Sequence, residues 1–386
     1  MRSRSPILLA LLLSCLACGE SSDTSGAGAT GGESGSGGSD ASGGASGSGG
    51  SNGGSGGSGG SSGASQGLRV EGNKIVGPDG QPFRGRGANL HDTRSCNACA
   101  HLPADPEGLK RWSDELLDNW GANFVRFDLE AYSGDDGWRQ QWQRLTDDAG
   151  YRADMENVVD HMTSKPGVYV MVTVFDDPSM RPNGSGYDAE WPTAETIPVY
   201  EALAEMFHDN PKVLFGLTNE PQGPVERNPE LLERYLAAID AIRAVEASHS
   251  APEHVVVVQA PQQWARYLDW FIDNPIQRSN VAYEVHAYVS EDEFDRLLIQ
   301  PSQTLPVLVG EHGPTEYSSE ADLQALWALC KQRDIPYLAW TFHMRCPPNL
   351  LQDTASDGCG HAASTGFDFP RTGWGDLFHA ELATPW

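Results

Sequence analysis

Eight short apolar segments alternate with amphipathic stretches between residues 85 and 342. The apolar segments span 85–90, 123–127, 168–174, 213–218, 255–259, 281–285, 307–309 and 337–342. Continuous apolar runs of this length are typical of strands that are covered on both faces, as in a parallel sheet. Helical spacing of apolar residues appears between several of them, around 109–120, 231–245 and 323–329. The alternation predicts an α/β fold.

Eight strand–helix units within about 300 residues favour a (β/α)8 barrel of the TIM type. A doubly wound open sheet is the alternative, but no Gly-rich nucleotide-binding turn follows the first strand. Before the barrel, residues 68–80 alternate apolar and polar side chains around Gly72-Asn73, which predicts a short N-terminal β-hairpin. We therefore predict a single barrel domain over residues 68–386.

The chain before residue 68 has two parts. Residues 1–18 start with two arginines and an apolar run that is too short to span a bilayer. The run ends in segments that resemble a bacterial lipobox, in which Cys15 or Cys18 would be lipidated; an ordinary cleaved signal is the alternative. Residues 19–67 are almost entirely Gly, Ser and Ala, which predicts a disordered linker. We expect an exported protein, either lipid-anchored at a bacterial cell envelope or surface, or secreted.

The charge of the chain excludes several kinds of partner. The formal net charge is −27, of which the segment up to residue 67 accounts for −2, leaving −25 on the barrel domain. Such a domain repels nucleic acid, anionic membrane surfaces and polyanionic substrates. We expect a neutral polymer as substrate, no nucleic-acid partner, membrane contact only through the N-terminal anchor, and a monomer.

Four cysteines lie in two loop-like segments, and export favours disulfides among them. We predict the local pairs Cys96–Cys99 and Cys346–Cys359, with a four-cysteine zinc site as the alternative. Cys330 belongs to a helical pattern and is predicted to be a buried free thiol.

Two glutamates directly follow apolar strands. Asn219-Glu220-Pro follows the fourth strand, and Gly-Glu311-His-Gly follows the seventh. Active sites of such barrels form at the carboxyl ends of the strands, and these two strands lie across the barrel from each other. Facing carboxylates about 5–5.5 Å apart suit retaining cleavage of a glycosidic bond, with one as acid and the other as nucleophile. Asp176 and Asp177 form a rival pair, but adjacent side chains point in different directions.

Other polar residues at strand ends would support this pair. Arg126 would hold Glu311 ionised by its charge, and Tyr288 would hydrogen-bond the nucleophile. Asn219 would bind the sugar 2-hydroxyl. His286 would orient Tyr288 or Glu220, or contact the sugar itself.

Taken in order, Asn219-Glu220-Pro, His286-Ala-Tyr288 and Gly-Glu311-His-Gly resemble glycoside hydrolase family 5, which contains cellulases and mannanases. The resemblance extends from residue 68 to the eighth strand. It implies retaining, endo-acting hydrolysis of a β-linked polysaccharide without a cofactor, with Glu220 as acid/base and Glu311 as nucleophile.

The resemblance also implies where the sugar binds. Trp340, at the end of the eighth strand, would be the sugar platform, and Trp264 would face the substrate. The family usually places a histidine after the third strand, but here residues 174–178 read Val-Phe-Asp-Asp-Pro. We expect His91, together with Asn89, to take part of that space. The missing histidine affects the prediction of the substrate class more than the prediction of the catalytic pair.

These observations predict an endo-β-1,4-glucanase-like enzyme. A β-mannanase or another β-glucan hydrolase of the same mechanism is the nearest alternative. A non-catalytic carbohydrate-binding barrel is an alternative of another class. We predict no metal, because no clustered set of His and Asp ligands follows the strands.

Overall fold

The computed structural model describes residues 67–92, 105–129, 144–175, 191–194, 196–261, 263–353 and 368–386, and the backbone of 131–134 and 137–140. The predicted signal and linker, with Cys15 and Cys18, lie outside the described residues. So do the rival pair Asp176 and Asp177 and three of the cysteines predicted to form bridges, Cys96, Cys99 and Cys359.

Eight parallel strands close into a barrel. They are β3 (Arg86–His91), β4 (Phe124–Leu129), β7 (Tyr169–Val174), β8 (Val213–Gly216), β9 (Val256–Gln259), β10 (Val281–Ala287), β11 (Val307–His312) and β12 (Tyr337–Ala339). Their order around the barrel follows the chain, and β12 pairs with β3 to close it. Each predicted strand matches one of these, so the TIM-barrel prediction is confirmed. The eighth was predicted too long, because β12 ends at Ala339, just before a cis peptide bond between Trp340 and Thr341.

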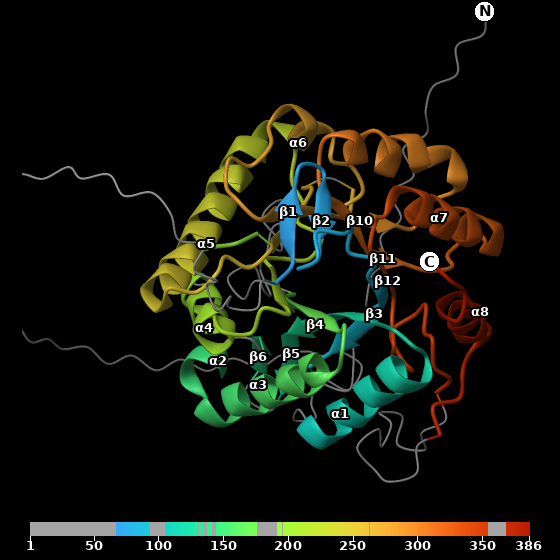
Figure 1. Ribbon diagram of the computed structural model, residues 1–386, viewed down its shortest axis with the longest axis horizontal. Helices are drawn as coiled ribbons and strands as arrows, with labels where there is room; N and C mark the ends of the chain where they lie inside the picture. Colours follow the sequence, from blue (N-terminus) through green and yellow to red (C-terminus); the bar gives the residue numbers. More distant parts are fainter. Residues whose placement is uncertain are drawn as a thin grey trace, which may run out of the picture. The chain divides into compact units, whose positions relative to one another are not determined.

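Helices surround the strands (Figure 1). They are α1 (Pro106–Asp114), which continues as a π-helix (Glu115–Asn119), α2 (Arg144–Asp147), α3 (Ala149–Ser164), α4 (Ile197–Phe207), α5 (Asn228–His249), α6 (Asp269–Asp273), α7 (Glu320–Arg333) and α8 (Gly373–Leu382). The three predicted helical repeats correspond to α1 with its π-helix, α5 and α7. Local sequence fixes several starts: Asp105 caps α1, and Ser319 and Asp322 form a capping box on α7. Among the described residues, none of the helices has both the length and the apolar character that crossing a membrane requires.

The predicted hairpin is confirmed as β1 (Arg69–Glu71) paired with β2 (Lys74–Val76). Leu68, Ile75 and Phe83 pack in one apolar cluster with the barrel interior at the start of the strands, including Phe124 and Leu308. The hairpin therefore covers the end of the barrel where the strands begin. A second antiparallel pair, β5 (Ala131–Gly134) and β6 (Gly137–Gln140), follows β4 and was not predicted.

Candidate active site

The barrel interior changes from apolar to polar along the strands. Side chains of a strand alternate between its two faces, so every second residue points inward. On β4 the inward series runs from Phe124, in the apolar interior cluster, to Arg126 and Asp128. On β10 it runs from Ala282 to Glu284 and His286. The carboxyl ends of the strands thus enclose a set of buried charges.

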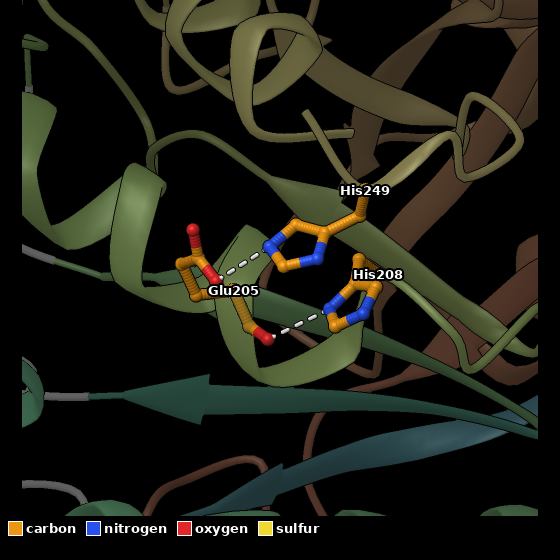
Figure 2. Close-up of side chains that lie close together, drawn as sticks. All are labelled: Glu205, His208 and His249. Carbon is orange, nitrogen blue, oxygen red and sulfur yellow. Dashed lines mark hydrogen bonds and ion pairs between the residues drawn. The ribbon is translucent and has the colours of Figure 1, made fainter. Parts of the chain in front are cut away.

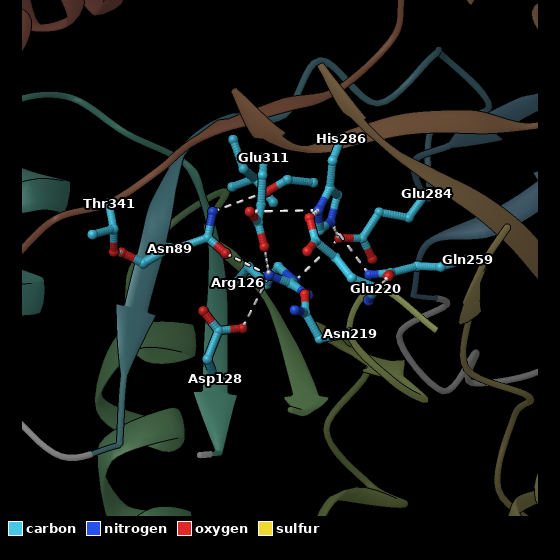
Figure 3. A network of polar contacts seen from close by, with 12 residues as sticks. Asn89, Arg126, Asp128, Asn219, Glu220, Gln259, Glu284, His286, Glu311 and Thr341 are labelled. Carbon is cyan, nitrogen blue, oxygen red and sulfur yellow. Dashed lines mark hydrogen bonds and ion pairs between the residues drawn. The ribbon is translucent and has the colours of Figure 1, made fainter. Parts of the chain in front are cut away.

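Arg126 is the central cation of this set (Figure 3). Its Nη1 donates to Asn89 Oδ1 and to Glu311 Oε1, both at 2.8 Å, and its Nη2 donates to Asn219 Oδ1 at 2.7 Å. Glu284 lies 3.2 Å from its Nε. Burial disfavours the charge, but the carboxylates of Asp128, Glu284 and Glu311 outweigh burial and raise the pKa of Arg126. The guanidinium therefore stays charged and fixes the positions of Asn219 and Glu311.

Glu311 lies on β11 and is almost fully enclosed. Tyr288 donates its hydroxyl proton to Glu311 Oε2 at 3.0 Å, as predicted, and Arg126 holds the other oxygen. Burial raises the pKa of the Glu311 carboxyl, and the positive charges of His286 and Arg126 only partly oppose this effect. Arg126 thus acts in the predicted direction, but it does not bring the pKa down to the ordinary value.

Glu220 follows β8 and is the more exposed of the two glutamates. Its side chain is 23% exposed, against 6% for Glu311. Its backbone has a φ of +46°, a left-handed conformation that is uncommon for residues other than glycine. Two contacts hold the backbone: Glu220 N donates to Gln259 Oε1 at 2.6 Å, and Gln222 Nε2 donates to Glu220 O at 2.8 Å. The Glu220 carboxyl reaches past β9 to His286 on β10.

His286 links the two glutamates. Its Nδ1 lies 2.7 Å from Glu220 Oε1 and 3.4 Å from Glu311 Oε2, and its Nε2 lies 3.1 Å from Glu284 Oε1. Burial disfavours the charged ring, but the surrounding carboxylates outweigh it and raise the pKa of His286 to about 10. Because both ring nitrogens face carboxylates, the ring is an imidazolium that donates from both sides. His286 orients Glu220, one of the roles predicted for it.

Ligand-type atoms of Glu220, His286 and Glu311 all lie within 4.8 Å of one another. The carboxyls of Glu220 and Glu311 thus lie close enough to act on one bond. The prediction concerned a set of His and Asp ligands, whereas this group contains two Glu and one His, so the predicted absence of a metal stays a prediction.

Two of the predicted sugar-binding residues have supporting positions instead. Asn89 and His91 are fully buried, and their contacts are with the protein. Asn89 Nδ2 donates to the carbonyls of Gly310 and Ala339, and His91 Nε2 lies 3.1 Å from Thr341 Oγ1. We therefore replace the predicted direct sugar contact of both residues with a role in fixing the ends of β11 and β12.

The two predicted tryptophans differ in exposure. Trp340 is 7% exposed, with the edge of His91 against it and Phe175 stacked on it at 5.9 Å between ring centres. Phe175 thus lies beside Trp340, in the segment where a histidine was expected. Trp264 is 52% exposed on the loop after β9. That loop is joined to the site because His286 N donates to Ala265 O.

Three residues of the charged network were not foreseen: Asp128, Glu284 and Gln259. Asp128 and Glu284 are fully buried, each two residues from a predicted site residue on the same strand. A charged residue within an apolar strand, at this spacing from Arg126 or His286, is a signal that identifies both. Gln259 lacks such a signal. It is uncharged and ends β9, and an amide side chain where a strand passes into a loop is common.

The cysteine predictions have a partial outcome. Cys330 is a buried free thiol, as predicted, and burial raises its pKa. Cys346 is also a buried free thiol, so the structure does not contain the predicted bridge to Cys359. Cys346 follows β12 within the packed core, where burial raises the pKa of its thiol.

Solved structures of similar fold include two cellulases. Cellulase Cel5C_n has a TM-score of 0.64 and 20% identity, covering 83% of this chain and 92% of the other. The catalytic domain of Thermobifida fusca endoglucanase Cel5A has a TM-score of 0.61 and 18% identity, covering 82% and 97%. These likenesses confirm the fold.

Sequence comparison identifies the family. Endoglucanase A of Butyrivibrio fibrisolvens is 26% identical over 265 residues, covering 66% of this chain and 54% of that protein. Endoglucanase MaCel5A of Microbulbifer sp. (strain ALW1) is 27% identical over 296 residues, covering 71% and 51%. The chain thus spans about half the length of these relatives. The profile of cellulase (glycosyl hydrolase family 5) matches residues 76–345, and the chain therefore belongs to glycosyl hydrolase family 5.

Proposed function

We propose that this chain is a retaining, endo-acting β-glycoside hydrolase that cleaves a neutral β-linked polysaccharide, with β-1,4-glucan as the favoured substrate. The observation that carries the proposal is the spacing of Glu220 and Glu311, whose carboxylate oxygens lie within 4.8 Å of each other. Retaining enzymes hold their two carboxyls about 5–5.5 Å apart, whereas inverting enzymes leave about 6.5–9.5 Å for a water molecule.

In the first step, a Glu311 oxygen attacks the anomeric carbon while the glycosidic C–O bond breaks. Glu220 donates its proton to the departing oxygen, and an ester forms between the sugar and Glu311. Arg126 and Tyr288 keep the carboxylate of Glu311 in place for the attack. The more exposed position of Glu220 suits the acid, because the leaving chain must depart past it.

In the second step, Glu220 takes a proton from water, the hydroxyl attacks the anomeric carbon, and Glu311 leaves as a carboxylate. The ester carries no charge, so esterification removes a negative charge next to Glu220 and favours its role as base. His286 contacts both carboxyls. It therefore lies next to the carboxylate of Glu311 in the first step and next to that of Glu220 in the second.

Three features support a neutral glucan. The barrel domain carries a net charge of −25, which disfavours acidic polymers. Trp264 is exposed on a loop at the mouth, where its aromatic ring suits stacking on a sugar ring. Both curated relatives described above are named endoglucanases.

The test uses amorphous cellulose, mixed-linkage glucan, mannan and xylan, all uncharged polymers, as substrates. We expect cleavage of β-1,4-glucan into mixed oligosaccharides, measured by product sizing, and NMR should find the β-anomer in the first product. If only mannan is cleaved, the enzyme is a β-mannanase and the proposed glucan substrate is wrong. Net inversion would contradict the role of Glu311, and no cleavage of any polymer would favour a non-catalytic binding barrel.

We further propose that the chain is exported and held at the cell envelope through Cys15 or Cys18, as a monomer. The lipobox-like run before these cysteines and the Gly/Ser-rich segment after them support this proposal. Replacing both cysteines with serine should move the protein into the soluble fraction with unchanged activity. The anchor proposal fails if the doubly substituted protein stays in the membrane fraction.

A further inference from the structure

A second group of acidic and imidazole side chains lies on the outer ring of helices (Figure 2). Glu205 belongs to the last turn of α4, His208 directly follows that helix, and His249 is the last residue of α5. Each helix ends a few residues before the next strand begins, β8 at Val213 and β9 at Val256. The group therefore lies at the end of the barrel opposite to Glu220 and Glu311.

The three side chains converge. His249 Nε2 lies 2.8 Å from Glu205 Oε2, and His208 Nδ1 lies 2.9 Å from the backbone oxygen of Glu205. The two imidazole rings stack with their centres 3.9 Å apart and their planes inclined by 22°. One ring nitrogen of each histidine and one carboxylate oxygen of Glu205 all lie within 4.8 Å of one another.

The chemistry of these donors selects the kind of ion. Two imidazoles and a carboxylate suit Zn²⁺, which binds such ligands at about 2.0–2.2 Å and accepts a water molecule as its fourth ligand. Ca²⁺ and Mg²⁺ prefer sets made of oxygen alone. Both helices present their C-terminal ends here, and the partial negative charge at a helix C-terminus attracts a cation. Glu205 and His249 are exposed, so their side chains are free to rotate and the stacked rings can separate to direct their nitrogens at one ion.

We propose that Glu205, His208 and His249 bind one Zn²⁺ ion, which ties the end of α4 to the end of α5. The ion takes the place of the proton shared by His249 and Glu205, and His208 exchanges its bond to the Glu205 carbonyl for the metal. Because the unfolded chain does not hold these ligands together, zinc stabilises the folded protein.

Isothermal titration of the full chain with zinc chloride, after removal of metals by EDTA, tests the site. Wild type should bind one more zinc ion than His249→Ala and Glu205→Gln, or bind it at least about tenfold more tightly. Zinc should also raise the melting temperature of wild type more than that of either variant. Both substituted residues are exposed, so neither substitution should disturb folding. The same loss of zinc binding in both variants would show that it does not come from misfolding of one of them.

His161→Ala is the matched control. His161 lies in a similar ion pair, 2.7 Å from Asp114, but the described residues offer it no third ligand. This variant should bind zinc as wild type does. Identical zinc titrations and melting shifts in wild type, His249→Ala and Glu205→Gln would overturn the proposal. Calorimetry reads the site without hydrolysis, so a failure here leaves the proposed function untouched.

Discussion

Glu220 and Glu311 carry the same functional group, and their neighbours differ. Glu311 accepts hydrogen bonds from Arg126 and Tyr288, which favour a carboxylate that stays in place to attack. Glu220 contacts one cationic donor, His286, and is the more exposed of the two. Their proposed roles as acid/base and nucleophile therefore lead to different results when each is removed.

Azide distinguishes the two roles. Glu311→Ala should lower activity by several orders of magnitude on every substrate, and added azide should yield the inverted glycosyl azide from the vacated side. Glu220→Ala should lose about 10²–10⁴-fold on substrates that need protonation, but much less on activated aryl glycosides. With azide it should give a retained product, since the ester on Glu311 still forms. NMR of the azide products decides, and the same anomer from both variants would refute the assignment.

Glu284 is predicted to act through His286 and Arg126, because it contacts both and is buried beside them. Glu284→Gln removes a negative charge next to the imidazolium, so the pKa of His286 should fall below about 10. NMR titration of the His286 ring measures this shift. We expect kcat/KM to drop by about 10²-fold, because both partners lose their fixed orientation.

Glu246→Gln provides the matched control for this variant. Glu246 is also a buried glutamate held by a histidine and an arginine, His254 and Arg243, but it lies on α5 outside the barrel. Its substitution should lower stability without moving the pKa of His286. A Glu284→Gln enzyme with normal titration of His286 would limit Glu284 to a structural role.

At the scale of elements, the sequence predicts the strands better than their contacts. Each strand is a short apolar run, and Glu220 and Glu311 follow two of them, so both were found. The partners of Arg126 come from strands up to 185 residues away, and no local pattern encodes those pairings. A register shift between Val285 and His286 places His286 opposite Glu311. The shift leaves Gly310 of β11 as an extra, unpaired residue, as in a β-bulge.

Gly310 shows how tightly β10 and β11 fit each other. A Cβ atom at this position would lie 1.7 Å from Glu284 Oε1 and 2.3 Å from its Cδ. Glu284 cannot easily yield, because it is fully buried between Arg126 and His286. Gly310→Ala should therefore lower the free energy of unfolding by about 1–3 kcal/mol, as overpacking does, and reduce activity as well.

Urea unfolding measures this loss, and Gly373→Ala is the control. No atom lies within 4 Å of a Cβ built at Gly373, which starts α8, so its substitution should leave stability unchanged or slightly raised. Adding Glu284→Ala to Gly310→Ala should restore part of the lost packing. Equal stability of Gly310→Ala and wild type would show that Glu284 moves aside freely.

At the scale of the whole molecule, buried histidines give stability a dependence on pH with two opposite signs. Burial lowers the pKa of His91 and His312 to about 3 and that of His343 well below 6.5. Their contribution is complete above pH 6.5, the unfolded value, and is lost as the pH falls toward the folded pKa. His286 has the opposite sign, because its pKa is raised to about 10. Its contribution is complete below pH 6.5 and is lost as the pH rises toward 10.

The free energy of unfolding should therefore peak near pH 6.5. It should fall more steeply on the acid side, where three histidines lose their contribution, than on the basic side, where only His286 does. Each group contributes a slope of up to about 1.4 kcal/mol per pH unit. Urea unfolding is followed between pH 5 and 6.5, because carboxyls with lowered pKa values titrate below this window, while Glu311, whose pKa is raised, adds the same slope to wild type and variant. His312→Gln keeps a donor toward the Leu338 carbonyl and an acceptor for the Trp327 N–H, but it cannot titrate. Its acid slope should be shallower than that of wild type, and equal slopes in the two proteins would show that His312 is not excluded from protonation in the folded state.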